Sequence, residues 1–123
     1  EWEHAVAAGT DHGSNIIVVP MTTGDNLCKS VDFRPDVIKI DVEGHEIKVL
    51  KGLAETIKEY SPLIFLEVHP KRIEEEGDST SFMEHFFYEL RYSAQLVSRV
   101  PFPLSSFRVM DYKKRLLLRK NAE

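Results

Sequence analysis

Two apolar segments that each end in polar residues constrain the fold of this chain most strongly. Residues 37–42 read Val-Ile-Lys-Ile-Asp-Val, and residues 63–69 read Leu-Ile-Phe-Leu-Glu-Val-His. Runs of this length and composition are typical of β-strands whose two faces are both covered by helices, as in parallel sheets. The segments therefore predict two buried strands of a parallel sheet.

A helix is predicted between these two strands. Apolar residues recur at helical spacing through residues 45–60, where they form one buried stripe of Ile47, Leu50, Ala54 and Ile57. Glu46 would lie at the positive end of the helix dipole, and Pro62 disfavours helical geometry at Ser61. Gly52 is interpreted as a position where the helix packs closely on the sheet. Strand, helix and strand in this order indicate an α/β fold.

The residues before this unit predict little regular structure. Residues 1–15 are polar and contain glycine, so we expect a loop or a poorly ordered start. Residues 16–19 are a short β-branched run that predicts a strand ended by Pro20. Residues 21–35 are expected to connect it to the next strand, with one short helical turn begun by Asp25.

The second half of the chain predicts a further helix and two shorter strands. Ser81 and Glu84 have the spacing of a capping box for a helix that runs to about residue 91. Residues 94–97 and 116–118 are strand candidates, separated by a proline-containing loop. The chain is therefore expected to form one α/β domain, mostly parallel, with an antiparallel edge made by its final pair of strands and an antiparallel last strand.

Composition and charge narrow the classes of function. The chain has 16 basic and 20 acidic residues and a net charge of −4, so no overall positive field attracts nucleic acid. A single cysteine, Cys28, excludes an internal disulfide and fits a reducing compartment, so a cytoplasmic location is expected. No apolar run approaches the length of a membrane span, so no membrane partner is expected either.

Polar side chains follow both predicted strands toward their carboxyl ends. Lys39, Asp41 and Glu43 would share one face of the first strand, and Glu67 and His69 would share one face of the second. Ligands bind at this edge of open parallel sheets because loops converge there. Neighbouring strands lie about 5 Å apart, so Asp41, Glu43, Glu67 and His69 are expected to converge on one reacting group.

Some of these residues also have a structural interpretation. Lys39 stands deeper in its strand and is interpreted as the ion-pair partner of a carboxylate. Glu67 is open to two interpretations, as a site residue or as an acceptor of backbone N–H groups from the helix that follows. Asp41 and Glu43 are interpreted as functional, because they lie at the ligand-binding edge of the sheet and Gly44 would let a ligand approach.

Three stretches together resemble the FkbM family of methyltransferases. They are residues 35–46 (Pro-Asp-Val-Ile-Lys-Ile-Asp-Val-Glu-Gly-His-Glu), residues 49–52 (Val-Leu-Lys-Gly) and residues 62–69, which end Leu-Glu-Val-His. Residues 20–27 are similar to the segment that precedes this block in the family, with Gly24 in place of the usual Leu after Thr-Thr. The resemblance spans roughly residues 16–70.

The resemblance implies the carboxyl-terminal part of a Rossmann-like class I methyltransferase that uses S-adenosylmethionine and methylates a hydroxyl oxygen of a small molecule or sugar. The strands at residues 37–42 and 63–69 would be the fourth and fifth of its sheet. The tail of the chain would supply the sixth strand and the antiparallel seventh.

By the same resemblance, Asp41 or Glu43 is the candidate base, and Glu67 and His69 line the acceptor side. Asp41 and Gly44 are the expected contacts with the methyl donor. A divalent metal held by Asp41, Glu43 or Glu67 is the second way to lower the pKa of the hydroxyl group. No metal is assigned, because no further carboxylate or Asn is placed to complete its shell.

One departure from the family concerns the donor site. Such domains hold the donor with a Gly-rich loop after the first strand and an acidic residue after the second, and residues 9–13 do not supply that loop. The chain is therefore expected to be the carboxyl-terminal half of an enzyme, inactive as an isolated fragment. A non-catalytic module that binds a partner through its sheet edge is the alternative, and a metal-dependent hydrolase is a third hypothesis. An open half-sheet also predicts a homodimer.

Overall fold

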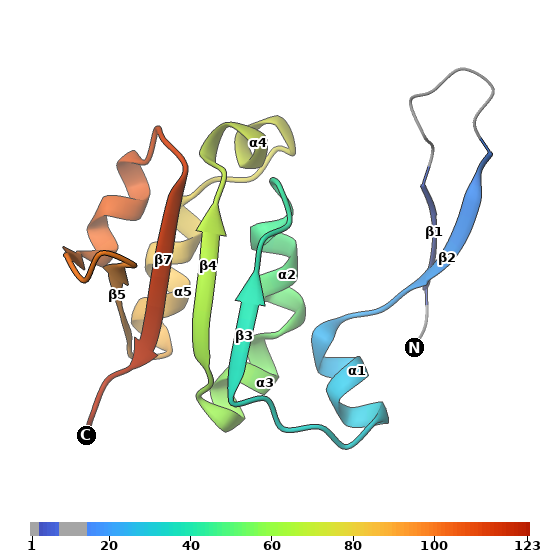
Figure 1. The fold of residues 1–123 in the computed structure, drawn as a ribbon, viewed down its shortest axis with the longest axis horizontal. Helices are drawn as coiled ribbons and strands as arrows, with labels where there is room; N and C mark the ends of the chain where they lie inside the picture. Colours follow the sequence, from blue (N-terminus) through green and yellow to red (C-terminus); the bar gives the residue numbers. More distant parts are fainter. Residues whose placement is uncertain (1–2, 8–14) are drawn as a thin grey trace.

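The computed structural model describes residues 3–7 and 15–123, and its main feature is a five-stranded sheet in the order β3-β4-β7-β5-β6. The strands are β3 (Val37–Ile40), β4 (Leu63–Val68), β5 (Tyr92–Leu96), β6 (Pro101–Phe102) and β7 (Lys114–Lys120). β3 and β4 pair in parallel. β7 pairs antiparallel with both β4 and β5, so these two strands point the same way (Figure 1).

The prediction of an α/β fold with an antiparallel last strand is confirmed, but the prediction of a mostly parallel sheet is wrong. Among the four pairings of this sheet, only β3 with β4 is parallel, because β6 also runs antiparallel to β5. The last strand does not form an edge either, since β7 lies between β4 and β5. Leu116 and Leu118 are at most 1% exposed, which fits a strand with a neighbour on each side.

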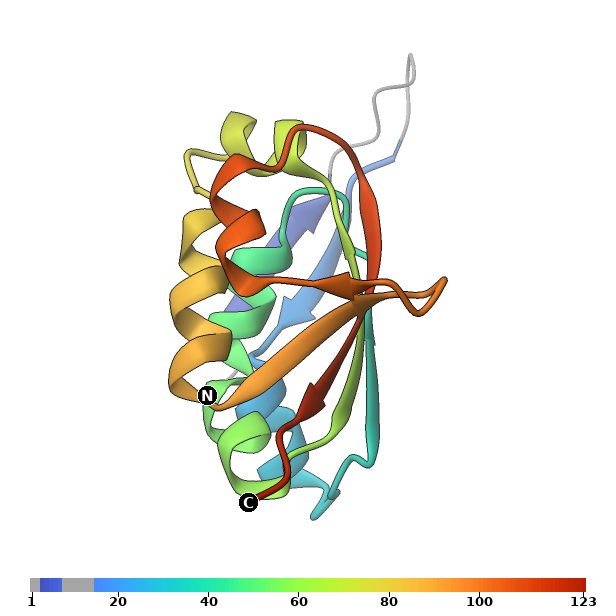
Figure 2. The same ribbon diagram turned by 90° about the vertical axis from the view of Figure 1, so that its left-hand side faces the viewer.

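Helices α2 (Glu46–Gly52), α3 (Ala54–Tyr60) and α5 (Ser81–Glu89) lie on one face of the sheet, and the described residues leave the other face uncovered (Figure 2). On β4, Ile64, Leu66 and Val68 are at most 1% exposed toward the helices, whereas Phe65 on the opposite face is 39% exposed. The expectation of strands covered on both faces is therefore wrong for this part of the chain. Apolar residues on the uncovered face, such as Phe65 and Val37, produced the continuous apolar pattern.

The single helix predicted over residues 45–60 is two helices. Leu53 separates α2 from α3, with a backbone φ of −111° and ψ of 4° that leave the helical region. Of the predicted buried stripe, Ile47, Leu50 and Ile57 are buried and Ala54 is half-buried. The second helix ends where Pro62 requires it, with Ser61 in the left-handed region. Gly52 packs closely on Thr23 rather than on the sheet, since a Cβ there would lie 3.3 Å from the Thr23 Cβ.

The amino-terminal residues are more regular than predicted. β1 (Glu3–Ala7) pairs antiparallel with β2 (Ile17–Met21), which contradicts a loop over that part of residues 1–15. The rest of the predicted loop, apart from residue 15, lies outside the described residues. Pro20 does not end β2 but pairs with His4 inside it. A strand of a two-stranded sheet has one free edge, where a residue without an N–H is tolerated.

The predicted helical turn at Asp25 is the seven-residue helix α1 (Gly24–Ser30). It begins after Thr23, whose side-chain oxygen accepts a hydrogen bond from the Asn26 N–H at 3.1 Å. Asp25 is buried and reaches across to α3, where it accepts hydrogen bonds from the N–H groups of Glu55 and Thr56 and from the Thr56 hydroxyl. This carboxylate therefore joins α1 to the start of α3.

The remaining elements complete the covered side of the sheet. Helix α4 (Pro70–Glu75) and the 3₁₀ helix η1 (Leu104–Val109) were not predicted. The capping box predicted for α5 does not form: Thr80 precedes the helix without a side-chain cap, and Glu84 contacts Arg108 at 2.7 Å instead. Over the part of the chain that the structure describes, no helix is both long enough and apolar enough to cross a membrane.

Candidate active site

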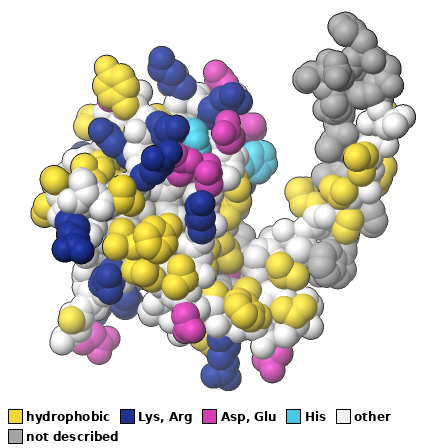
Figure 3. All heavy atoms as spheres, in the orientation of Figure 1, with side chains coloured by type: hydrophobic (Ala, Val, Ile, Leu, Met, Phe, Trp, Pro, Cys, Tyr) yellow, Lys and Arg dark blue, Asp and Glu magenta, His cyan; other side chains and the backbone are white. Residues whose placement is uncertain are grey.

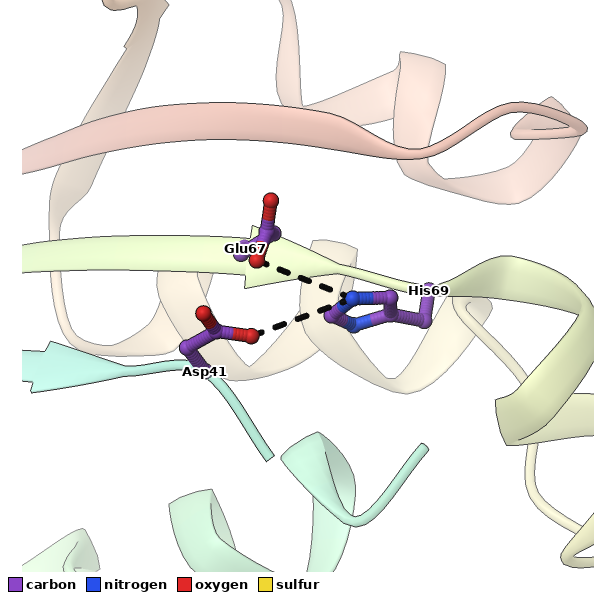
Figure 4. A group of neighbouring side chains, drawn as sticks. All are labelled: Asp41, Glu67 and His69. Carbon is purple, nitrogen blue, oxygen red and sulfur yellow. Dashed lines mark ion pairs between the residues drawn. The ribbon is translucent and has the colours of Figure 1, made fainter. Parts of the chain in front are cut away.

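Three of the predicted site residues meet at the carboxyl ends of the two parallel strands. Asp41 directly follows β3, Glu67 is the penultimate residue of β4, and His69 follows β4. Because β3 and β4 are parallel neighbours, these ends lie at the same edge of the sheet. One oxygen of each carboxylate and one nitrogen of His69 all lie within 4.8 Å of one another (Figure 4).

The imidazole of His69 lies between the two carboxylates. Its Nε2 is 3.8 Å from Asp41 Oδ1 and 3.7 Å from Glu67 Oε2, and both distances exceed those of good hydrogen bonds. The side chains of His69 and Glu67 are each 12% exposed, whereas that of Asp41 is 41% exposed. The group is therefore reached from solvent on the side of Asp41.

Glu67 is held by two basic residues through one of its oxygens. Arg115 Nε donates a hydrogen bond to Glu67 Oε1 at 3.0 Å, and Lys113 Nζ lies 3.7 Å from the same oxygen. The other oxygen, Oε2, faces His69. β7 thus supplies the cations that orient Glu67, and it leaves one carboxylate oxygen directed into the site.

The pKa values of Asp41 and Glu67 are shifted in opposite directions. A hydrogen bond with Glu67, together with desolvation and the negative charge of Glu67, raises the pKa of Asp41 above its ordinary value. The same hydrogen bond, supported by Arg115 and Lys113, holds the pKa of Glu67 below its usual range. As the pH falls, Asp41 therefore takes up a proton before Glu67 does.

Glu46 is a residue of this region that the sequence interpretation placed only at a helix dipole. Its side chain is fully buried and accepts hydrogen bonds from the N–H of Gly44 at 2.6 Å and from the N–H of His69 at 3.0 Å. Its Oε1 also lies 3.4 Å from His69 Nδ1, where the geometry does not make a hydrogen bond. A signal was present, because Glu46 stands four residues before the buried Leu50 and thus on the apolar stripe of the helix.

Glu43 does not join the group that Asp41, Glu67 and His69 form. β3 ends at Ile40, so the alternation expected along this segment does not reach Glu43. Glu43 lies in a turn with φ of 49°, its side chain is 67% exposed, and its recorded ion-pair contact is Arg72 at 3.9 Å. The predicted convergence of four residues is therefore reduced to three.

The packing of α4 against this turn explains why residue 44 is a glycine. Its φ is +106°, and a Cβ at this position would lie 2.7 Å from the Cβ of Arg72 in α4. Close approach of α4 therefore accounts for a glycine here, and the expected contact of Gly44 with a methyl donor stays a prediction. Lys39 acts on the site through its positive charge, which lowers the pKa of Asp41.

A hollow of about 250 Å³ adjoins this group on the uncovered face of the sheet. Its walls come from β3, β4, β7 and the segment after β5, and they include Lys39, Phe65, Val97 and Arg115. Figure 3, which views this face, shows charged side chains gathered above a patch of hydrophobic ones. The hollow thus combines an apolar floor with acidic and basic groups at one end, which suits a small polar molecule.

Comparisons with known proteins show the family of the chain. The Methyltransferase FkbM domain matches residues 1–94 of the chain. The hexuronic acid methyltransferase AglP of Haloferax volcanii is 35% identical over 54 residues, which are 43% of this chain and 22% of that protein. No solved structure shows a significant match. The match to the domain covers more than half of the sequence, and the chain therefore belongs to the FkbM family of methyltransferases.

Proposed function

We propose that this chain supplies the acceptor side of a methyltransferase that uses S-adenosylmethionine to methylate a hydroxyl oxygen of a sugar or another small molecule. The observation that carries the proposal is the convergence of Asp41, Glu67 and His69 at the ends of β3 and β4, beside a hollow of about 250 Å³. Membership of the methyltransferase family suggests methyl transfer as the reaction in which these residues take part.

The strand directions support a Rossmann-like class for the sheet. In this proposal β3, β4, β5 and β7 are the fourth, fifth, sixth and seventh strands that the family resemblance implies. β3, β4 and β5 point the same way, and β7 runs against them, as the resemblance requires. The acidic edge then lies where open α/β sheets bind their ligands.

An acidic sugar is the acceptor class that we favour. The relative AglP is named for a hexuronic acid, although the matched segment covers only 22% of its length. In this chain, Lys39 and Arg115 line the hollow, and Lys113 lies nearby against Glu67. Their positive charges complement a sugar carboxylate, while the apolar floor at Phe65 suits the face of a sugar ring.

The chemistry assigned to this chain is the positioning and deprotonation of the acceptor. Asp41 is the proposed proton acceptor, because it is the most exposed of the three residues and faces the entrance to the site. Glu67, fixed by Arg115, and His69 would hold the acceptor hydroxyl in place. The donor, when bound, supplies the methyl group of its sulfonium centre.

The described residues fit the acceptor better than the donor. A strand, β1, does precede the glycine-containing residues 9–13, but the next described element is the strand β2 rather than a helix, and the space beside Gly44 is taken by Arg72. In this proposal most of the donor contacts therefore lie outside this chain. A cytoplasmic location is part of the proposal and is supported by the free cysteine Cys28.

A partner-binding module without catalysis is the second candidate function. The uncovered face of the sheet exposes Val37 and Phe65, and β3 is the last strand at one end of the sheet. Such an edge and face suit another protein segment or a second copy of the chain. In gel filtration with light scattering, the proposed homodimer elutes at twice the monomer mass, and a monomer at all concentrations would exclude it.

Calorimetric titration of S-adenosylmethionine into the chain separates the two candidates, and an assay with a radiolabelled methyl donor and uronic-acid sugars extends the test to the reaction. Saturable heat and label transfer that Asp41→Asn abolishes support the methyltransferase. Full label transfer by Asp41→Asn would remove Asp41 from the mechanism. Neither heat nor transfer, from this chain or from the protein as encoded by its gene, would favour the module.

A further inference from the structure

The spacing of the polar atoms of Asp41, Glu67 and His69 can be compared with that of the ligands of one metal ion. Two carboxylate oxygens face one imidazole nitrogen at 3.7 and 3.8 Å, too far for hydrogen bonds. Two ligands that each lie about 2.1 Å from one ion are about 3.0 Å apart at a right angle and about 4.2 Å apart when opposite. The two oxygen–nitrogen separations fall between these limits, and all three ligand atoms lie within 4.8 Å of one another. One small cation therefore reaches both oxygens and the nitrogen with only small side-chain rotations.

Each of the two best-buried members is oriented by a neighbour outside the group. Glu67 gives one oxygen to Arg115 and Lys113, and its free oxygen points to His69. The backbone of His69 is tied to Glu46 by a 3.0 Å hydrogen bond, and its Nδ1 faces the same buried carboxylate. A carboxylate beside Nδ1 favours the tautomer with the proton on that atom, which leaves the lone pair of Nε2 directed at the space between Asp41 and Glu67.

This outer support distinguishes the group from an ordinary cluster of surface acids. Metal-binding histidines in proteins usually donate their second ring N–H to a carboxylate or a carbonyl group. His69 Nδ1 faces Glu46 at 3.4 Å without making that bond, so the support here comes from the hydrogen bond between the His69 backbone N–H and Glu46. Here the supporting Glu46 is fully buried, and the His69 side chain is only 12% exposed. The two features come from α2 and from the end of β4, so they are independent of the acidic pair itself.

We propose that Asp41, Glu67 and His69 form a binding site for one divalent transition-metal cation, with Mn²⁺ or Zn²⁺ as the matching ions. One imidazole and two carboxylates make a mixed nitrogen and oxygen ligand set, which suits these ions better than Ca²⁺, which takes six to eight oxygens. Three protein ligands leave positions open on the side of Asp41, which is 41% exposed. The role of these positions in binding an acceptor oxygen rests on the proposed function, whereas ion binding itself does not.

The positive charges of Arg115 and Lys113 limit the affinity of the site. Both lie within 4.0 Å of Glu67, so they offset part of the negative charge that attracts the ion. We therefore expect binding in the micromolar range rather than the permanent binding of a structural zinc site.

The test is a titration of the full 123-residue chain, first treated with a chelator, with Mn²⁺ followed by electron paramagnetic resonance of the free ion. The expected result is one bound Mn²⁺ per chain, and at least about tenfold weaker binding by Asp41→Asn and by His69→Gln. His85→Gln is the matched control, because His85 is 80% exposed and lies on α5. This variant should bind Mn²⁺ as tightly as the parent chain.

Asp41→Asn keeps the test decisive if the partly buried His69→Gln fails to fold, because Asp41 is exposed and its replacement should leave the circular dichroism spectrum unchanged. Absence of saturable Mn²⁺ binding, or equal binding by the parent chain and folded Asp41→Asn, would overturn the proposal. Binding of Mn²⁺ by this chain, with no affinity for S-adenosylmethionine in the protein as encoded by its gene, would sustain the metal site while removing support for the proposed function. Binding of S-adenosylmethionine without binding of Mn²⁺ would support the proposed function and overturn the metal site.

Discussion

Replacement of Glu46 by Gln tests whether one buried carboxylate holds the candidate site together. The parent side chain accepts the N–H of Gly44 at 2.6 Å and the N–H of His69 at 3.0 Å, each on a different oxygen. Gln has nearly the same shape but only one acceptor oxygen, and its NH₂ group would face one of these two N–H donors. One hydrogen bond is therefore lost, and the other loses its charge assistance.

The magnitude follows from the burial of Glu46, which is 0% exposed. A buried donor left without a partner costs about 1–3 kcal/mol, and the weaker remaining bond adds about 1 kcal/mol. We expect Glu46→Gln to lower the free energy of unfolding by about 2–4 kcal/mol. The free energy of unfolding falls by about 1–3 kcal/mol per molar urea, so the unfolding midpoint should fall by roughly 0.7–4 M.

Urea unfolding followed by far-ultraviolet circular dichroism measures this shift. The matched control is Glu75→Gln, which makes the same chemical change at an exposed position of α4 and should alter stability by less than about 0.5 kcal/mol. Equal midpoints for Glu46→Gln and the parent chain would refute the role that we give this carboxylate.

Three further changes test other contacts. Asp25→Ala removes the hydrogen bonds from α3, including two from Thr56, and should lower the free energy of unfolding by about 2–3 kcal/mol in the same urea assay. Burial raises the pKa of Tyr92 from 10.0 to about 12. Burial of the neutral phenol therefore contributes on the order of 2–3 kcal/mol to the free energy of unfolding. This contribution is complete below pH 10 and is lost as the pH rises to 12. Tyr92→Phe, which lacks the hydrogen bond to the Pro62 carbonyl, should lose this dependence in unfolding curves at pH 9 to 12. Glu43→Gly should keep or slightly raise stability, because φ of 49° suits glycine, and methyl transfer that survives this change would exclude Glu43 as the base.

The parts of the fold that the sequence predicted are those governed by local periodicity. The run at Ile64, Leu66 and Val68 and the stripe at Ile47 and Leu50 are buried as expected, because alternation and helical spacing follow from backbone geometry alone. The place of β7 between β4 and β5 depends on pairing between residues about 50 positions apart, such as Leu66 with Leu116. No local pattern encodes that choice, since a short apolar strand with charged ends suits an inner position as well as an edge.

The residues of the candidate site likewise include some that local sequence patterns predicted and some that they did not. Asp41, Glu67 and His69 were predicted together because each lies at the end of a strand, and parallel pairing brings those ends side by side. Glu43 was wrongly grouped with them because the alternation was carried past Ile40, where β3 ends and a turn begins. Glu46 was missed because its two hydrogen bonds go to backbone N–H groups, whose positions are set by the turn after β3 and by the end of β4.

The segment from Asp41 to Glu46 accordingly combines two kinds of task. Asp41 faces the site, whereas Gly44 and Glu46 shape the turn: the missing Cβ of Gly44 lets α4 approach, and the carboxylate of Glu46 ties this turn to the backbone of His69. The distance between Asp41 and His69 therefore depends on packing behind the sheet rather than on contacts within the site itself. A substitution at Gly44 or Glu46 should then disturb the site as strongly as one at Asp41, while leaving all three site side chains chemically intact. Loss of Mn²⁺ binding in a folded Gly44→Ala variant would be the measurable sign of this dependence, and unchanged binding would show that the three side chains find their positions without the turn.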